Sequence, residues 1–454
     1  MDALDHRLVQ VVPAPRQLAL QQMEFYAFVH FTVNTFTDRE WGDGTECPAV
    51  FNPTKFDADQ WVTAIKDAGM KGLILTCKHH DGFCLWPSKY TAHTVAASPY
   101  KGDIVGEVAA ACRAAGIKFG VYLSPWDRHQ PLYGQGKAYD DYFVAQLTEL
   151  LTHYGEVFSV WFDGACGEGP NGKKQYYDWD RYYAVIRELQ PGACIHVCGP
   201  DIRWCGNEAG DTREAEWSVV PRRTADTEKI TSDSQQADDD AFRQRPIHAD
   251  DRDLGSRQVL ENERDLIWYP AEVNTSIRPG WFWHESENDK VRPIEKLIDI
   301  YEKSVGGNAT FLLNIPPTNE GLFHEHDVAR LRELGEYIRQ SYAKNLLDAA
   351  VLEAPAAAEG HGIECVRKDD DSYYIPAEEN GTAAILLRWQ EAQTIRRVVL
   401  KEQILLSQRV ERFAVDALVN GTWNQAARGT VIGYKRIVVL GGIKTAALRI
   451  RILD

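Results

Sequence analysis

Two carboxylates stand where a side chain could do chemistry on a bound molecule. Asp163 directly follows the apolar run VFSVWF at 157–162, and Glu208 lies in the loop-like segment GNEAG at 206–210. An unpaired buried carboxylate is costly to keep charged, so Asp163 has either a structural partner or a chemical task. A carboxylate pair suits glycoside hydrolysis, in which one group attacks the anomeric carbon or activates water and the other protonates the departing oxygen. Asp163, at a rigid strand end, fits the first role, and Glu208, on a loop, fits the second.

Other polar and aromatic residues lie at or just after the ends of further apolar runs. They are His30, His79, His80, Tyr122, Trp161 and Arg203. Each has a plain alternative explanation: His30 alone could be a hydrogen-bonded core histidine, and Trp161 alone a core residue. The pair His79 and His80 suggests metal ligation, but adjacent strand residues point to opposite faces and no H-x-E or H-x-x-x-H partner lies nearby. Convergence of the set on one face favours a shared site, because otherwise each plain explanation would have to hold independently.

Near-continuous apolar runs alternate with amphipathic helical patterns through the first three quarters of the chain. The predicted strands cover 25–31, 72–79, 117–125, 157–164, 193–199, 215–220 and 309–315. The predicted helices cover 57–70, 103–116, 180–192, 293–306 and 325–343. About seven or eight such units in ~340 residues favour a (β/α)8 TIM barrel over a doubly wound sheet. Barrel active sites lie at the carboxyl ends of the strands, which is where the residues above are expected.

The pattern changes after about residue 345. Short strand-like runs with turns then predominate and no helical stretch intervenes, which predicts a carboxyl-terminal β-sandwich. We therefore expect two domains, a catalytic barrel at 1–345 and a sandwich at 346–454, joined by the segment AAVLEAPAAAEG. Within the first domain, the polar tract at 222–266 is a poor core former and is expected to be a long surface loop near the barrel mouth.

Composition argues against several classes of partner. The 454 residues carry a formal net charge of -16, which argues against nucleic acid and anionic membrane surfaces. The nine cysteines include no C-x-x-C pair and lie mostly in apolar runs, which predicts reduced thiols. The first residues, MDALDHRLVQVVPAP, lack the basic and apolar regions of a signal peptide, and no apolar run is as long as a membrane span. A cytoplasmic location is expected.

Long motifs resemble the α-L-fucosidases of glycoside hydrolase family 29. They are LTCKHHDGFCLWPSKYTAHTV, GDIVGEVAAACRAAGIKFGVYLSPWDRH, VWFDG, SIRPGWFWH and KSVGGNATFLLNIPP, and the resemblance covers most of residues 15–345. Two further segments, HFTVNTFTDREWGDGTE and RWCGNEAG, are similar to the subgroup that acts on α-1,3/1,4-linked fucose in branched Lewis-type sugars. The carboxyl-terminal motifs SQRVERFAV and GTVIGYKRI resemble the discoidin-like sandwich that follows the barrel in this family.

The resemblance implies a retaining mechanism through a covalent fucosyl-enzyme intermediate, with a fucosylated oligosaccharide as substrate and no cofactor or metal. It implies that Asp163 is the nucleophile and Glu208 the acid/base, with Glu214 and Glu216 as nearby rivals for the second role. The fucose-binding residues that it implies are His30, Trp41, Glu46, His79, His80, Tyr122, Trp161, Arg203 and Trp283. A retaining enzyme needs its two carboxyl groups about 5–5.5 Å apart, which predicts either that separation for Asp163 and Glu208 or a Glu208 loop that is swung away from the site.

Three other interpretations stay open from the sequence. The first is a metal-dependent hydrolase that uses His30, His79, His80 and Asp163. The second is a protein that binds fucose without cleaving it. The third is a broad-specificity α-L-fucosidase that also accepts α-1,2 linkages or aryl fucosides. The oligomeric state cannot be read from the sequence.

Overall fold

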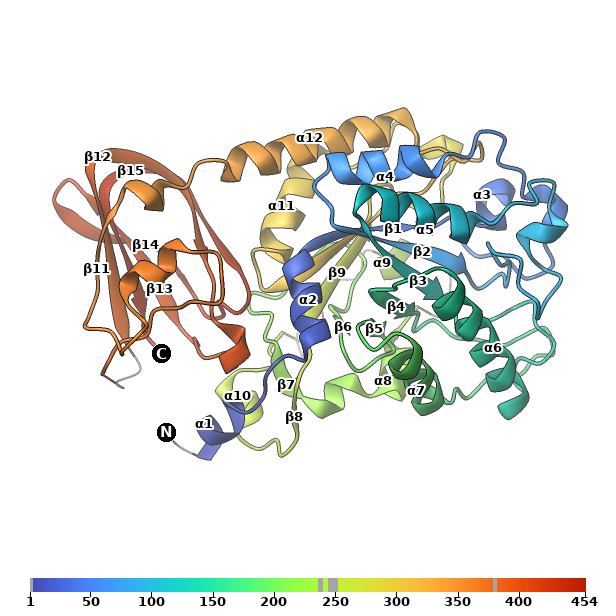
Figure 1. The fold of residues 1–454 in the computed structure, drawn as a ribbon, viewed down its shortest axis with the longest axis horizontal. Helices are drawn as coiled ribbons and strands as arrows, with labels where there is room; N and C mark the ends of the chain where they lie inside the picture. The colour runs from blue at the N-terminus through green and yellow to red at the C-terminus, as the bar shows by residue number, and fades with distance from the viewer. Residues whose placement is uncertain (1–2, 236–239, 244–251, 379–381) are drawn as a thin grey trace.

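The computed structural model describes residues 3–235, 240–243, 252–378 and 382–454, and its first part is an eight-stranded parallel barrel (Figure 1). The strand order is β5-β4-β3-β2-β1-β10-β9-β6, and a parallel bridge between His196 and Ile202 links β5 to β6, which brings the barrel close to full closure. The strands are β1 (Phe25–Val29), β2 (Gly72–Lys78), β3 (Lys118–Leu123), β4 (Ser159–Phe162), β5 (Cys194–Val197), β6 (Arg203–Trp204), β9 (Ala271–Ser276) and β10 (Ala309–Asn314). The predicted (β/α)8-type TIM barrel is confirmed.

Helices cover the outside of the barrel, so its parallel strands are buried on both faces. Every residue of β1, β2 and β10 is buried. The helices of the barrel part are α1 (Ala3–Leu8), α2 (Pro15–Met23), α3 (Val33–Thr37), α4 (Ala58–Asp67), α5 (Ile104–Ala115), α6 (Lys137–His153), α7 (Trp179–Leu189), α11 (Ile294–Ser304) and α12 (Glu325–Tyr342). The side chains of Asp57, Asp103 and Asp178 accept backbone N–H groups at the starts of α4, α5 and α7, which fixes where these helices begin.

The prediction for the sixth barrel strand is wrong. Residues Val219–Pro221 form β7, which pairs antiparallel with β8 (Leu266–Trp268) outside the barrel. The short β6 takes the sixth barrel position instead, and β9 takes the seventh. Between β7 and β8, the tract that was expected to be one long loop contains the short helices α8 (Thr227–Asp233), α9 (Asp240–Arg243) and α10 (Arg257–Leu260). Residues 236–239 and 244–251 of this tract lie outside the described residues.

The carboxyl-terminal part is an antiparallel sheet with order β11-β12-β15-β13-β14. Its strands are β11 (Val351–Glu353), β12 (Ala383–Leu400), β13 (Phe413–Val419), β14 (Thr422–Gly429) and β15 (Arg436–Ile452). The register of β12 against β15 shifts twice, between Arg388 and Gln393 and between Ile395 and Arg397, so these long strands bend. Residues from both halves of β12 and β15 share one core with Phe413, which gives the two layers of the predicted β-sandwich.

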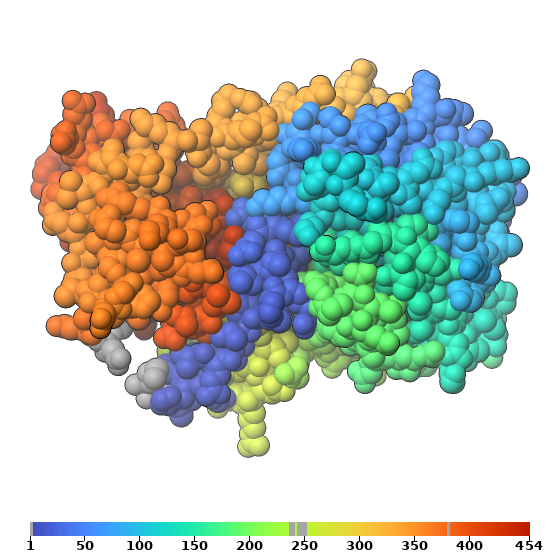
Figure 2. Space-filling view, viewed as in Figure 1, coloured from blue at the N-terminus to red at the C-terminus, as the bar shows by residue number. Residues whose placement is uncertain are grey.

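The two parts pack directly against each other (Figure 2). Ile437 of β15 belongs to the core cluster of the barrel, and Lys435 donates to both carboxylate oxygens of Glu24 at 2.9 and 3.0 Å. None of the nine cysteines forms a disulfide bond, as their placement in apolar runs predicts. Among the described residues, no helix combines the length and apolar character that a membrane crossing requires.

Candidate active site

The carboxyl ends of the first three barrel strands bring several of the predicted site residues together. His30 follows β1, His79 and His80 follow β2, and Tyr122 lies near the end of β3. The ring of His30 lies 5.6 Å from that of His79 and 6.0 Å from that of Tyr122, and the rings of His79 and His80 are 4.1 Å apart. Because parallel barrel strands end at one face, these side chains form a single cluster at the barrel mouth.

Asp163 follows β4 at the same face and is both fixed and accessible. The Tyr122 hydroxyl donates to Oδ2 at 3.0 Å, and the backbone N–H of Ala165 donates to Oδ1 at 2.9 Å. His80 Nε2 lies 3.7 Å from Oδ2. Burial raises the pKa of Asp163, and the N–H of Ala165 and the hydroxyl of Tyr122 offset part of that rise. The side chain keeps 23% exposure, so a molecule at the mouth can reach the carboxylate.

Hydrogen bonds fix which nitrogen of His30 carries the proton. Nδ1 lies 2.8 Å from Oδ1 of Asn314, whose amide nitrogen donates to Ser276 Oγ and to the carbonyl of Trp281. The Asn314 oxygen is therefore an acceptor, and Nδ1 of His30 is the donor. Burial lowers the pKa of His30 to about 4, so near neutral pH the ring is uncharged and Nε2 carries a lone pair.

His80 is fixed in a similar way. The Ser124 hydroxyl donates to the carbonyl of Trp126 at 2.6 Å, so it accepts from Nδ1 of His80 at 2.7 Å. Burial lowers the pKa of His80 to about 3, which leaves Nε2 as an acceptor. Burial also lowers the pKa of His79, whose buried Nδ1 has no hydrogen-bond partner within the described residues. The cluster therefore offers neutral imidazoles that can bind hydroxyl groups.

Trp161 links this cluster to the barrel interior. Its ring stacks on that of Tyr122, with centroids 5.4 Å apart and planes at 27°. Its indole N–H donates at 2.8 Å to Glu272, a fully buried residue of β9. Glu272 also accepts from the hydroxyl of Tyr26 at 2.5 Å and lies 2.8 Å from Nδ1 of His196. Sequence reasoning missed Glu272, because the segment that forms β9 was not among the predicted strands.

Glu208 lies on the loop after β6. The Thr275 hydroxyl, near the end of β9, donates to its backbone carbonyl at 2.7 Å, and the indole N–H of Trp281 donates to its carboxylate Oε2 at 2.9 Å. The Trp281 ring lies 5.2 Å from that of His30. Glu208 is partly exposed and reaches the same barrel face as Asp163 through this contact. The separation of about 5–5.5 Å between the two carboxyl groups stays a prediction.

Neither rival of Glu208 is placed to transfer a proton. Glu216 is fully buried between Arg203 and Arg213, at 3.1 and 3.2 Å. Burial alone would raise the pKa of Glu216, but the two arginines outweigh it and hold the pKa below the ordinary value. Glu214 is exposed, and its carbonyl accepts from Arg436 of the sandwich at 3.1 Å. Glu216 is therefore structural, and Glu214 belongs to the contact between the two domains.

The prediction that Arg203 binds the sugar is not supported by its position. Arg203 is the first residue of β6 and pairs with Ala271, the first residue of β9, whereas the mouth lies at the other end of these strands. Its guanidinium is buried, where it pairs with Glu216 and donates to the carbonyls of Tyr269 and Trp217. The sequence places Arg203 only five positions before Glu208, but Arg203 begins the two-residue β6 and Glu208 lies on the loop that follows it.

The role of Trp283 in binding the sugar stays a prediction. The indole N–H of Trp283 donates to Asn288 at 3.0 Å. Trp281, two positions earlier, contacts the cluster, and its ring lies 5.2 Å from that of His30 and 6.2 Å from that of Phe28. Phe282 contacts the cluster as well, with its ring 5.3 Å from that of His30 and 5.0 Å from that of His79. The motif SIRPGWFWH contains both tryptophans, and only the loop geometry separates their roles.

Trp41 and Glu46 contribute to the site in different ways. The Trp41 ring meets that of His80 edge to face at 5.4 Å, so it forms part of the wall of the cluster. The Glu46 carboxylate accepts the backbone N–H groups of Asp43 and Gly44 at 2.7 and 2.9 Å. Glu46 therefore orders the turn that follows Trp41.

His79, His80 and Asp163 also form a possible metal-binding group. One ligand atom from each lies within 4.8 Å of the others, and within the described ranges no other set of three such residues does so. Neutral imidazoles and a carboxylate are a donor set that zinc accepts. His30, the fourth residue of the metal hypothesis, is not in this group. A metal here would occupy the atoms that otherwise face a sugar, so the two interpretations compete for one place.

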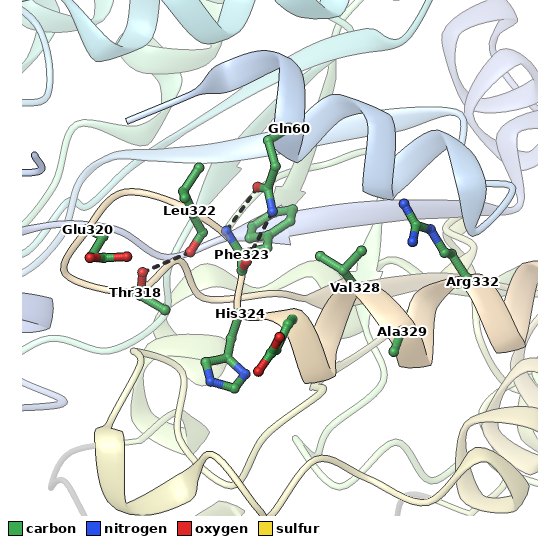
Figure 3. A pocket seen from close by; sticks show the side chains of 10 residues that line it. Gln60, Thr318, Glu320, Leu322, Phe323, His324, Val328, Ala329 and Arg332 are labelled. Carbon is green, nitrogen blue, oxygen red and sulfur yellow. Dashed lines mark hydrogen bonds between the residues drawn. The ribbon is translucent and has the colours of Figure 1, made fainter. Parts of the chain in front are cut away.

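A cavity of about 450 Å³ lies elsewhere, beside α4 and α12 (Figure 3). Its polar groups are largely paired with one another. Gln60 donates to the carbonyl of Phe323 and accepts its N–H, and Thr318 donates to the carbonyl of Leu322. The cavity therefore lacks the convergent unpaired groups that the barrel mouth has.

Comparison with known proteins relates most of the chain to one family. The family model described as alpha-L-fucosidase matches residues 15–342. Alpha-L-fucosidase 1 of Arabidopsis thaliana is 39% identical over 440 residues, which covers 94% of this chain and 81% of that protein.

Solved structures agree in fold over almost the full length. A glycoside hydrolase 29 family member from an unknown rumen bacterium is 38% identical with a TM-score of 0.80, and the match covers 98% of this chain and 75% of that one. A Ruminococcus gnavus GH29 fucosidase in complex with fucose is 29% identical with a TM-score of 0.83, and the match covers 97% and 91% of the two chains.

Proposed function

Because the chain belongs to the α-L-fucosidases of glycoside hydrolase family 29, we propose that it is a retaining exo-glycosidase for terminal α-1,3/1,4-linked L-fucose in branched, Lewis-type oligosaccharides. The observation that carries the proposal is the placement of Asp163. It ends a rigid strand, its two oxygens are held by Tyr122 and Ala165, and its carboxylate stays reachable from the mouth. That is the arrangement a nucleophile needs, because it has to meet one carbon from one direction.

In the proposed reaction, Asp163 attacks the anomeric carbon of fucose while Glu208 gives its proton to the departing oxygen. The glycosidic bond breaks as the ester bond to Asp163 forms. Water then attacks the same carbon, the Glu208 carboxylate takes a proton from that water, and the ester bond breaks to release fucose. Two inversions at the anomeric carbon leave its configuration unchanged.

The cluster around Asp163 suits a neutral deoxy sugar. Lone pairs on His30 and His80 accept from sugar hydroxyls, and the rings of Trp41 and Trp281 supply apolar walls for the methyl group. The related Ruminococcus gnavus fucosidase was solved with fucose bound, which supports fucose as the sugar recognised here. The α-1,3/1,4 preference is supported by the segments HFTVNTFTDREWGDGTE and RWCGNEAG, which supply Trp41 and Glu208 to the rim.

The test is fucose release from two sugars side by side, a Lewis a or Lewis x trisaccharide and a linear α-1,2-fucosylated lactose. Strong release from the trisaccharide and little from the linear sugar is the expected result. Equal release would overturn the linkage preference and favour the broad-specificity fucosidase. Asp163→Asn should abolish both activities while it keeps the fold by circular dichroism. Release that survives this substitution would remove Asp163 from the nucleophile role, and no release by wild type would favour fucose binding without cleavage.

A further inference from the structure

Two rim loops of the barrel are joined by the carboxylate of Glu40. Glu40 lies on the loop after α3, just before Trp41, and is almost fully buried. Its Oε2 accepts the backbone N–H of Trp281 at 2.9 Å, and its Oε1 accepts that of Phe282 at 3.1 Å. Trp281 and Phe282 belong to the loop after β9, so one side chain holds the backbone of a second loop at two adjacent positions.

His284 adds a charged contact to this junction. Its Nε2 lies 2.7 Å from Oε1 of Glu40, and its Nδ1 lies 2.6 Å from Oδ1 of Asp38. Its hydrogen bonds to Glu40 and Asp38 raise the pKa of His284 to about 9 against the opposing effect of burial. Near neutral pH the ring is therefore an imidazolium that donates to a carboxylate from each nitrogen.

The space between the loops leaves room only for glycine at position 280. A Cβ atom added to Gly280 would lie 2.5 Å from Oε1 of Glu40 and 3.0 Å from Cδ2 of His284. The junction is therefore packed as closely as the interior of the protein, although it lies at the rim of the site.

Trp281 connects the junction between the two loops to Glu208. Its backbone N–H is held by Glu40 and its carbonyl accepts from Asn314 at 2.8 Å, so both sides of the residue are fixed. Its ring rests against His30 at 5.2 Å, and its indole N–H reaches Glu208 Oε2 at 2.9 Å. The carboxyl group of Glu208 is thereby oriented by Trp281, and the position of Trp281 is determined by its contact with Glu40.

We propose that Glu40 and His284 form a clamp that fixes Trp281 and, through its indole N–H, sets the orientation of the Glu208 carboxyl group for proton transfer. Glu40, His284 and Trp281 act in this way as positioning residues. The inference rests on the proposed function, because it takes Glu208 as the acid/base.

The clamp has a kinetic signature that a purely structural role lacks. A departing phenolate with a low pKa leaves with little proton donation, whereas a sugar alcohol or a weakly acidic phenol needs a well-placed acid. Loss of orientation at Glu208 should therefore slow substrates with poor leaving groups much more than those with good ones. A variant that only lowers the folded fraction slows both classes by the same factor.

The experiment compares kcat/KM for 2-chloro-4-nitrophenyl α-L-fucoside, a good leaving group, with phenyl α-L-fucoside, a poor one. Trp281→Phe keeps an aromatic ring and removes the N–H donor, and Glu40→Gln removes one of the two acceptor oxygens. For both variants we expect the phenyl fucoside to lose about tenfold more kcat/KM than the nitrophenyl fucoside, the size expected for one hydrogen bond to a charged group. Glu287→Gln is the matched control, because Glu287 accepts the N–H of Gly280 in the same loop at 3.1 Å, whereas Glu40 accepts the backbone N–H of Trp281 and Glu208 accepts its indole N–H.

Equal losses on the two substrates in Trp281→Phe and Glu40→Gln would overturn the clamp. So would an equal selective loss in the Glu287→Gln control. Glu208→Gln separates this failure from failure of the proposed function: a strongly leaving-group-dependent loss in that variant keeps Glu208 as the acid even if the clamp fails. If the loss in Glu208→Gln does not depend on the leaving group, Glu208 is not the acid. If Glu40→Gln does not fold by circular dichroism, Trp281→Phe alone decides the outcome.

Discussion

Replacement of Tyr122 by phenylalanine tests whether Asp163 reacts as an ionised nucleophile. The substitution removes only the hydroxyl that donates to Asp163 Oδ2 at 3.0 Å. The ring remains, and with it the stacking on Trp161 at 5.4 Å and on His79 at 5.8 Å. The variant therefore changes the electrostatic environment of Asp163 more than the packing around it.

The size of the effect follows from the lost hydrogen bond. A hydrogen bond to a charged group contributes about 1.5–3 kcal/mol, so Tyr122→Phe should destabilise the ionised form of Asp163 by about this amount relative to the protonated form and thereby raise its pKa. Burial already raises this pKa in the wild type, and the Tyr122 hydroxyl opposes that rise. The nucleophile has to be ionised, so activity is lost as pH falls through its pKa. The acidic limb of kcat/KM should therefore move to higher pH in the variant.

The assay is the pH profile of kcat/KM on an aryl α-L-fucoside, measured from the acidic limb to neutral pH. Tyr269→Phe is the matched control, because Tyr269 is also fully buried and its hydroxyl donates to the carbonyl of Gly199 at 2.8 Å, outside the histidine cluster. We expect the acidic limb of this control to coincide with that of the wild type. If the acidic limb of folded Tyr122→Phe also coincides with the wild type, then Asp163 is not the group that titrates there, and the reasoning fails.

Two further predictions concern stability and metal dependence. The pKa of His284, raised to about 9 by Glu40 and Asp38, gives stability that is fully present below pH 6.5 and lost as pH rises through 9. The shift limits the contribution of these contacts to the free energy of unfolding to about 3 kcal/mol. Because Asp38 is 80% exposed and water screens its charge, we expect a contribution of about 1–2 kcal/mol. Urea unfolding should show His284→Gln less stable than wild type at pH 6 by this amount and nearly equal at pH 10; an equal gap at both pH values would refute the assignment. Treatment with EDTA followed by desalting should leave kcat/KM unchanged, because the proposed chemistry uses two carboxylates. Loss of activity that Zn²⁺ restores would favour the metal-dependent hydrolase.

The sequence predicts the barrel where strands are long and apolar and misses it where they are short. The runs at 25–31 and 72–79 become β1 and β2, because apolar strands between helices have few other ways to be buried. The run at 215–220 is equally apolar, yet its end forms β7 outside the barrel. The true sixth strand has only two residues and no periodicity to detect. Its place in the barrel depends on parallel pairing with β9, a tertiary contact that local pattern does not encode.

The same difference between long and short strands explains which predicted site residues lie at the barrel mouth. His30, His79 and His80 directly follow well-formed strands and Tyr122 lies near the end of one, so strand direction alone brings them to the mouth. The prediction for Arg203 comes from a motif around the short β6, where the backbone path decides which side chain faces the site. Glu40 was missed for a related reason, because its partners lie some 240 positions later in the chain.

Asp163 and Glu208 are held in different ways, and each way matches the step proposed for the residue. Asp163 follows a barrel strand, and its donors come from the neighbouring strand and from its own turn. Such support suits an atom that has to meet one carbon along one line, because misplacement by a fraction of an ångström is costly. Glu208 follows the two-residue β6, and its carboxylate is oriented by Trp281 from another loop. A group that protonates a departing oxygen and later deprotonates water has to serve atoms at slightly different positions. Support through a loop contact provides that freedom, and the clamp on Trp281 limits it.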